Sequence, residues 1–194
     1  HYVNWIEEQL SSGIMWNERH LWTSVRPNGP NRPHDLNRLE LRICDCITDC
    51  DLLLAITALL ELRLLSLFAT PNLLDPLKAS SLSVDELANL CDKNDLLAAQ
   101  NSLDASLNHW LDGKPILCRE WISKLLHDVI PLANQRGIAH LLDPIYLVLE
   151  GGNEAMKWLK SYSSGHSVDE IVQKSIVEME IKESSPNQAE VILG

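Results

Sequence analysis

Two stretches near the start of the chain alternate apolar and polar side chains, and this alternation is the strongest constraint on the fold. Residues 38–45 place Leu39, Leu41 and Ile43 on one side of an extended chain and Arg38, Glu40, Arg42 and Cys44 on the other. Residues 20–26 repeat the pattern, with His20, Trp22, Ser24 and Arg26 on one side. Because successive side chains of a strand point to opposite faces, the pattern predicts two half-buried antiparallel strands. Residues 27–35 between them are rich in Pro, Gly and Asn, which predicts a long-looped hairpin.

A helical pattern replaces the alternation after residue 47. Thr48 or Asp49 is placed to cap a helix that runs over about residues 52–69. This helix is apolar nearly all round, so we expect it to lie in a core. A short helix is also expected over residues 5–10, because Gly13 just beyond it tolerates the left-handed geometry of a helix end.

Capping patterns predict the remaining helices. Ser83-x-x-Glu86 is a capping box that opens a short helix, and Asn94 or Asp95 is expected to begin a second helix that ends at Gly113. Pro115 is expected in the first turn of the helix that follows. Four further helices are expected over about residues 115–137, 143–151, 153–162 and 167–180, the last with a Ser167-x-x-Glu170 box.

The order of these elements predicts an α+β fold, with strands early in the chain and helices after them. We assign residues 1–69 to a sheet-bearing region and residues 70–181 to a helical region. Residues 182–194 are polar and contain Pro186, and we expect them to form a disordered tail.

Charge and hydropathy exclude two classes of partner. The chain carries 27 acidic and 16 basic residues, a formal net charge of −11, whereas binding a nucleic acid backbone requires clustered Lys and Arg. The longest apolar run, residues 52–69, is interrupted by Glu61 and Arg63, which argues against a membrane span. We therefore expect neither a nucleic acid nor a membrane as partner.

The chain begins at His1 without a Met or a signal-peptide pattern, and we expect it to be part of a longer protein. Its five cysteines suit the reducing cytoplasm better than a disulfide framework. Cys44, Cys46 and Cys50 raise the alternative of a zinc site. Their C-x-C-x3-C spacing differs from the paired C-x2-C of zinc sites, so buried thiols are the preferred interpretation.

The polar face of the second strand is the first candidate for chemistry. Glu40 and Arg42 stand two positions apart there, with Arg38 one step further. A carboxylate can bind Mg²⁺ through oxygen, and a guanidinium can neutralise phosphate charge through two hydrogen bonds. The competing interpretation is a solvated strand face with a local ion pair.

The second candidate is Arg26, which ends the first strand before Pro27. A guanidinium held at a stiff turn can bind a carboxylate in two-point fashion, although an arginine beside a turn can equally be an ordinary surface residue. His20 and Trp22 share its face. Both can also be structural, the ring of Trp22 by simple packing.

Residues 19–29 and 35–45 together resemble the glutamate-cysteine ligases of cyanobacteria and, more broadly, the carboxylate-amine ligases. The most specific part is an Arg26-Pro27 turn followed by the strand Leu39-Glu40-x-Arg42-x-Cys44-Asp45. The similarity continues through residues 55–61, 102–105 and 152–155, so that it covers most of residues 1–165. Cys46 and Cys50 depart from the usual pattern but lie outside the motif positions.

The resemblance implies a catalytic sheet related to that of glutamine synthetase, with ATP and Mg²⁺ as cofactors and glutamate and cysteine as substrates. It implies that Glu40 binds Mg²⁺ and that Arg42 contacts the transferred phosphoryl group. Arg26 would help to hold the substrate glutamate, and we assign Trp22 and Arg38 to substrate binding as well. The implied product is γ-glutamylcysteine, formed in the first step of glutathione biosynthesis.

The family also carries a Gly-Phe-Glu-Ile-Glu-like strand with further metal ligands, and no segment of this chain matches it. Residues 1–194 alone are therefore expected to lack ligase activity and to need an N-terminal part of the catalytic domain as partner. Two alternatives remain, namely a ligase of this type that uses another amine acceptor and a non-catalytic helical interaction module.

Overall fold

The computed structural model describes residues 2–14, 25–27, 39–41 and 47–184, and the chain divides into two compact units, His1–Cys46 and Ile47–Gly194. The described part is mainly helical with two small antiparallel sheets, which confirms the predicted α+β class. The first unit contains α1 (Tyr2–Ser11), β1 (Val25–Pro27) and β2 (Leu39–Leu41). The backbone of Gly13 beyond α1 has a φ of +74°, as expected of a helix end.

The predicted hairpin is confirmed where the structure describes it, because β1 pairs with β2 in antiparallel register. The rest of both predicted strands, and most of the loop between them, lie outside the described residues.

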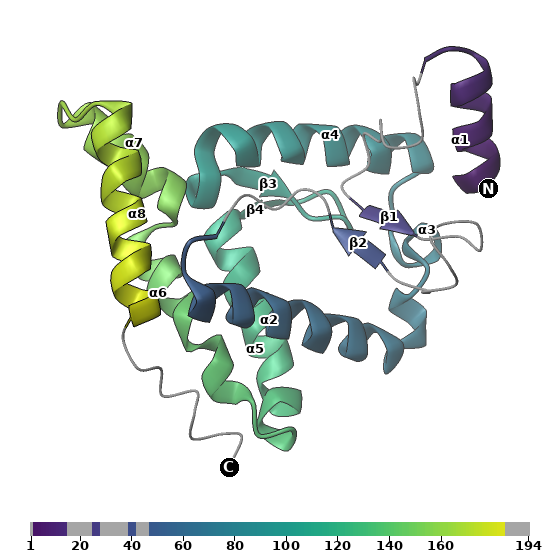
Figure 1. Ribbon diagram of the computed structural model, residues 1–194. Helices are drawn as coiled ribbons and strands as arrows, with labels where there is room; N and C mark the ends of the chain where they lie inside the picture. The colour runs from purple at the N-terminus through teal and green to yellow at the C-terminus, as the bar shows by residue number, and fades with distance from the viewer. Residues whose placement is uncertain (1, 15–24, 28–38, 42–46, 185–194) are drawn as a thin grey trace. The chain divides into compact units, whose positions relative to one another are not determined.

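The second unit consists of helices and one further hairpin (Figure 1). It contains α2 (Cys50–Phe68), η1 (Pro71–Leu73), α3 (Pro76–Ala79), α4 (Val84–Asn101), η2 (Ser102–Asp104), β3 (Ser106–Asn108), β4 (Pro115–Leu117), α5 (Cys118–Gln135), η3 (Ala139–Leu142), α6 (Asp143–Gly151), α7 (Glu154–Ser163) and α8 (Val168–Ser184). Among the helices that the structure describes, none combines the length and the apolar character needed to cross a bilayer.

The main core lies where α2 crosses α5, closed by η3 and α6 (Figure 1). Its buried side chains are Ala55, Ala58, Leu62, Leu126, Val129, Ala133, Leu142 and Ile145. The expectation that α2 lies in a core is confirmed for one face, which contributes Ala55, Ala58 and Leu62, whereas Leu54 is 54% and Phe68 65% exposed. The small side chains of Ala55 and Ala58 let α5 approach the buried face of α2 closely.

Helix ends follow the predicted caps. The carboxylate of Asp49 accepts hydrogen bonds from the amides of Asp51 and Leu52 at 3.0 and 3.3 Å, and so caps α2. The Ser83–Glu86 capping box is formed at the start of α4, and Ser167 and Glu170 make the same reciprocal bonds before α8. α8 continues to Ser184, so residues 182–184 of the predicted tail are helical, and residues 185–194 lie outside the described residues.

The helix predicted over residues 94–113 is wrong. α4 runs without a break from Val84 to Asn101, and β3 and β4 follow as a hairpin, which places Pro115 in a strand instead of a helical turn. The side chain of Asn94 does not cap a helix. It accepts a hydrogen bond from the amide of Asn108 and donates one to its carbonyl, both at 2.8 Å, and so fixes β3 against α4.

We predict that Leu62→Ala lowers the free energy of unfolding by about 2–5 kcal/mol, because it leaves a cavity where α2 meets α5. Leu62 has no exposed surface, whereas Leu60 on the same helix is 39% exposed and serves as the control. Leu60→Ala should cost less than half as much in urea unfolding. Equal losses for the two variants would show that the buried face of α2 has been assigned wrongly.

Candidate functional site

Two of the five predicted site residues lie at partner positions of paired strands. The register of β1 and β2 sets Arg26 opposite Glu40, between the pairs Val25–Leu41 and Pro27–Leu39. Partner positions of an antiparallel pair belong to the same face of the sheet. A basic and an acidic position thus stand opposite each other on one face, a pairing that the sequence alone did not reveal because the long loop hides the register.

The other three predicted site residues, Arg42, Arg38 and Trp22, lie outside the described residues, as does His20. The roles assigned to all five site residues stay predictions. What the structure adds is the backbone framework that brings positions 26 and 40 together.

A second cluster joins two segments that carry the family resemblance, residues 102–105 and 152–155. The side-chain amide of Asn153 donates a hydrogen bond to the hydroxyl of Ser102 at 2.6 Å. The other end of the Asn153 side chain accepts from the amide of Met156 at 3.0 Å and caps α7. Ser102 ends α4 with a φ of 52° and a ψ of −129°, a backbone conformation that residues other than glycine rarely adopt.

Arg119, at the start of α5, extends this cluster. Its Nε lies 2.9 Å from the carboxylate of Asp104, its Nη1 donates to the carbonyl of Leu149, and its Nη2 lies 3.9 Å from the sulfur of Met156. One planar guanidinium therefore connects η2, α6 and α7. Since its nitrogens face protein groups, Arg119 holds the helices in place and is not itself placed to bind a substrate.

Polar contacts also connect the start of α2 with the last two helices. The hydroxyl of Thr48 lies 3.1 and 3.0 Å from the two carboxylate oxygens of Glu154, and Lys182 pairs with Asp49. Partial burial by itself raises the pKa of Asp49. The hydrogen bond and charge of Lys182, with the amides of Leu52 and Asp51, outweigh that effect and hold the pKa below its ordinary value.

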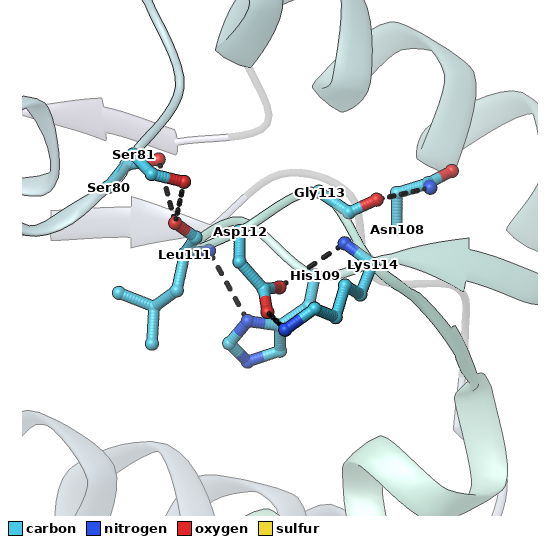
Figure 2. Close-up of polar contacts among 8 residues, drawn as sticks. All are labelled: Ser80, Ser81, Asn108, His109, Leu111, Asp112, Gly113 and Lys114. Atoms are coloured by element: carbon cyan, nitrogen blue, oxygen red, sulfur yellow. Dashed lines mark hydrogen bonds and ion pairs between the residues drawn. The ribbon is translucent and has the colours of Figure 1, made fainter.

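The turn between β3 and β4 uses its polar groups for its own structure (Figure 2). The carbonyl of Leu111 accepts from the amide and hydroxyl of Ser81 at 2.8 and 3.1 Å, and Asp112 pairs with Lys114 at 2.8 Å. The amide of Leu111 donates a hydrogen bond to Nδ1 of His109 at 3.3 Å, so this ring nitrogen acts as the acceptor. The imidazole is thus engaged in the turn, and its geometry does not suggest a catalytic base.

Metal binding by cysteine stays an open alternative. Cys44 and Cys46 lie outside the described residues. The expectation of a buried thiol is wrong for Cys50, which is exposed in the first turn of α2. Within residues 47–184, the structure contains no group of three His, Cys, Asp or Glu side chains placed to hold an ion.

Sequence analysis missed Arg119, the Thr48–Glu154 contact and the Asn153–Ser102 bond as organising residues. A signal was present, because residues 102–105 and 152–155 both carried the resemblance. Nothing in their spacing showed that the two segments meet in space, since Ser102 and Asn153 are separated by a hairpin, two α-helices and a 3-10 helix.

The strand pair and the two joined segments lie in the part of the chain that matches a known family of ligases. The family model for glutamate-cysteine ligase family 2 matches residues 1–179, and the chain belongs to this family. It is 26% identical over 177 residues to a protein of Gloeobacter violaceus and 23% identical over 172 residues to one of Leifsonia xyli subsp. xyli, both named "Putative glutamate--cysteine ligase 2". Each alignment covers 88% of this chain and 43% of the relative, so the chain spans less than half the length of these proteins.

Asn153 offers a direct test of the junction between residues 102–105 and 152–155. Asn153→Ala removes both the cap of α7 and the bond to Ser102, and we expect it to lower the free energy of unfolding by about 1–3 kcal/mol. Ser102→Ala keeps the cap of α7 but removes the hydroxyl that accepts from Asn153, so it should lose about half as much. Thermal unfolding of the three proteins measures both effects. A Ser102→Ala variant as stable as the native protein would show that the Ser102 bond contributes nothing.

The lowered pKa of Asp49 predicts a dependence of stability on pH. A carboxyl group whose pKa is lower in the folded state stabilises the protein above its unfolded pKa, and this contribution disappears as the pH falls through the folded value. Asp49→Asn keeps a capping oxygen but no charge. Its melting temperature should therefore lie below that of the native protein at about pH 6 and approach it at about pH 2.

Asp92→Asn, an exposed change in the middle of α4, is the control for this pH series. A gap between Asp49→Asn and the native protein that stays constant across the range would contradict the assigned role of the Asp49 charge.

Proposed function

We propose that this chain supplies the Arg26, Glu40 and Arg42 portion of the active site of an ATP-dependent ligase that joins the γ-carboxylate of glutamate to the amine of cysteine. Membership of glutamate-cysteine ligase family 2 over residues 1–179 supports the reaction class. The observation that carries the site is the register that sets Arg26 opposite Glu40. Because the chain spans 43% of each relative, the activity is proposed for the complete protein.

The proposed reaction has two steps. A γ-carboxylate oxygen of glutamate attacks the terminal phosphorus of ATP, which forms an acyl phosphate and releases ADP. The cysteine nitrogen then attacks the acyl carbon, the C–N bond forms, the C–O bond to phosphate breaks, and the amine loses a proton. Most of the rate in such a reaction comes from positioning the reactants and neutralising charge.

Each proposed residue has a part in this scheme. Arg42 would neutralise charge on the transferred phosphoryl group, and Arg26 would hold a carboxylate of the substrate glutamate through its two-pronged guanidinium. Trp22 and Arg38 would complete the glutamate-binding surface. All five residues belong to His1–Cys46, and Arg26 and Glu40 are the two that the structure describes, in the paired strands.

Glu40 would bind the Mg²⁺ that accompanies ATP. The chemistry fits in part, since Mg²⁺ prefers oxygen ligands and Glu40 supplies a carboxylate at the partner position of Arg26. One carboxylate does not complete an octahedral ion, so the remaining ligands would come from phosphate oxygens, water and acidic residues of another part of the complete protein. On this basis residues 1–194 alone are inactive, and the complete protein would carry out the first step of glutathione biosynthesis in the cytoplasm.

Replacement of Glu40 and Arg42 tests the proposal in the complete protein. Glu40→Gln and Arg42→Ala should each lower kcat/KM by about 100-fold or more, because each removes a charge that the transition state needs. ADP release in the presence of glutamate, cysteine and ATP is the measurement. Glu8→Gln, an exposed change in α1, is the matched control and should leave turnover unchanged.

The same experiment separates the alternatives. Turnover that survives both substitutions while association with another protein changes would support a helical interaction module. Competition among amines for the complete enzyme tests the acceptor, and a preference for an amine other than cysteine would establish a related ligase. Formation of γ-glutamylcysteine by residues 1–194 alone would refute the proposal that the site needs further segments.

A further inference from the structure

A cleft of about 510 Å³ opens between the start of α2 and helices α6, α7 and α8. Its volume falls within the range of about 300–1,000 Å³ that is typical of small-molecule sites. All of its walls belong to the second unit, so its shape does not depend on where the first unit lies.

The cleft is lined by six charged side chains in equal numbers of each sign. They are Asp49, Glu154, Lys157, Lys174, Glu178 and Lys182. This balance differs from the chain as a whole, which has a net charge of −11. Three of these side chains are acidic and three are basic. A ligand with charges of one sign only, such as a dicarboxylate or a polyamine, would therefore be repelled by half of them.

Four of these charges pair with one another across or along the walls. Lys182 pairs with Asp49, and Lys174 lies 3.9 Å from Glu178 one turn further along α8. The remaining two are Glu154 and Lys157, both on α7.

Within the described part of the chain, neither Glu154 nor Lys157 forms an ion pair, and Glu154 accepts only the hydroxyl of Thr48. A carboxylate and an ammonium are thus left facing the same cleft. Residues three apart on a helix are neighbours on its surface, so the two groups are close enough to contact one small molecule.

The rest of the wall is apolar and held in place. Leu147 and Val148 of α6 line one side, and Trp158 of α7 lines another. The indole N–H of Trp158 donates to the hydroxyl of Ser175 on α8 at 3.0 Å, which fixes the ring between the two helices. A ligand body with CH₂ groups between its charged ends would contact these surfaces.

We propose that this cleft binds a small zwitterion of the amino-acid or short-peptide class. Its ammonium group pairs with Glu154 and its carboxylate with Lys157, while its body lies against Leu147 and Trp158. The proposal goes beyond the ligase function and does not depend on it, because it concerns binding by the second unit.

Isothermal titration of residues 1–194 with triglycine tests the proposal, with N-acetyltriglycine and triglycine amide as ligands that each lack one charge. Triglycine should bind saturably with a Kd below about 5 mM, and loss of either ligand charge should weaken binding about tenfold, the worth of one charge-assisted hydrogen bond. The indole proton resonance of Trp158 should shift with the same Kd.

Lys157→Ala should weaken triglycine binding about tenfold and leave the variant unable to distinguish triglycine from its amide. Lys160→Ala is the matched control, because Lys160 is exposed on the same helix but does not line the cleft. Both are surface changes, so circular dichroism should show unaltered folding.

Absence of saturable triglycine binding would overturn the proposal. So would equal binding of succinate, which has two carboxylates and no ammonium, or a Kd that Lys157→Ala and Glu154→Gln leave within about twofold of the native value.

Discussion

The contact between α2 and α5 determines where the other elements of the second unit can lie. Ala55 and Ala58 present little side chain, so α5 comes close enough for Leu126 and Val129 to lose all contact with water. This crossing also fixes the starts of both helices. Thr48 and Asp49, before α2, then reach α7 and α8, and Arg119, at the start of α5, reaches the end of α6. Polar residues at the ends of the core helices thus bond to α6, α7 and α8 and fix their positions relative to the apolar core.

The two units of this chain carry charged residues in different settings. The first presents Arg26 and Glu40 at partner positions of a strand pair, and the proposed ligase reaction draws on that pair. The second is a helical body whose charged groups are mostly engaged with one another, with Glu154 and Lys157 as the pair that faces a cleft. The charges proposed for catalysis and the residues of the helical core thus lie in separate parts of the sequence.

Local signals predicted the elements that depend on local contacts. Asp49, Ser83, Asn153 and Ser167 all begin helices as expected, because a cap bonds amides only two or three residues away. The antiparallel pairing of β1 and β2 followed from alternation in the same way. Their register did not, since it is set across a loop whose length fixes no particular pairing.

Predictions failed where a distant partner decided the outcome. Asn94 has the side chain of a cap, but it bonds both backbone groups of Asn108, and α4 continues past it. The apolar composition of α2 indicated burial without showing which side would be covered, so the exposure of Leu54 and Phe68 was not foreseen. For the candidate site, strand alternation singled out the residues and the family resemblance suggested their roles, while the Arg26–Glu40 pairing required coordinates.

The backbone of Ser102 has a consequence for how the second unit stores strain. A residue other than glycine at a φ of 52° raises the free energy of the folded state by about 1–3 kcal/mol, and the hydrogen bond from Asn153 helps to hold the serine there. The hairpin that follows does not depend on this bond, because Asn94 ties β3 to α4 and the hairpin buries Ala105, Leu107 and Ile116 in a small core of its own. Backbone strain at the end of α4 is thus offset by contacts on both sides of it, from α7 through Asn153 and from the hairpin core.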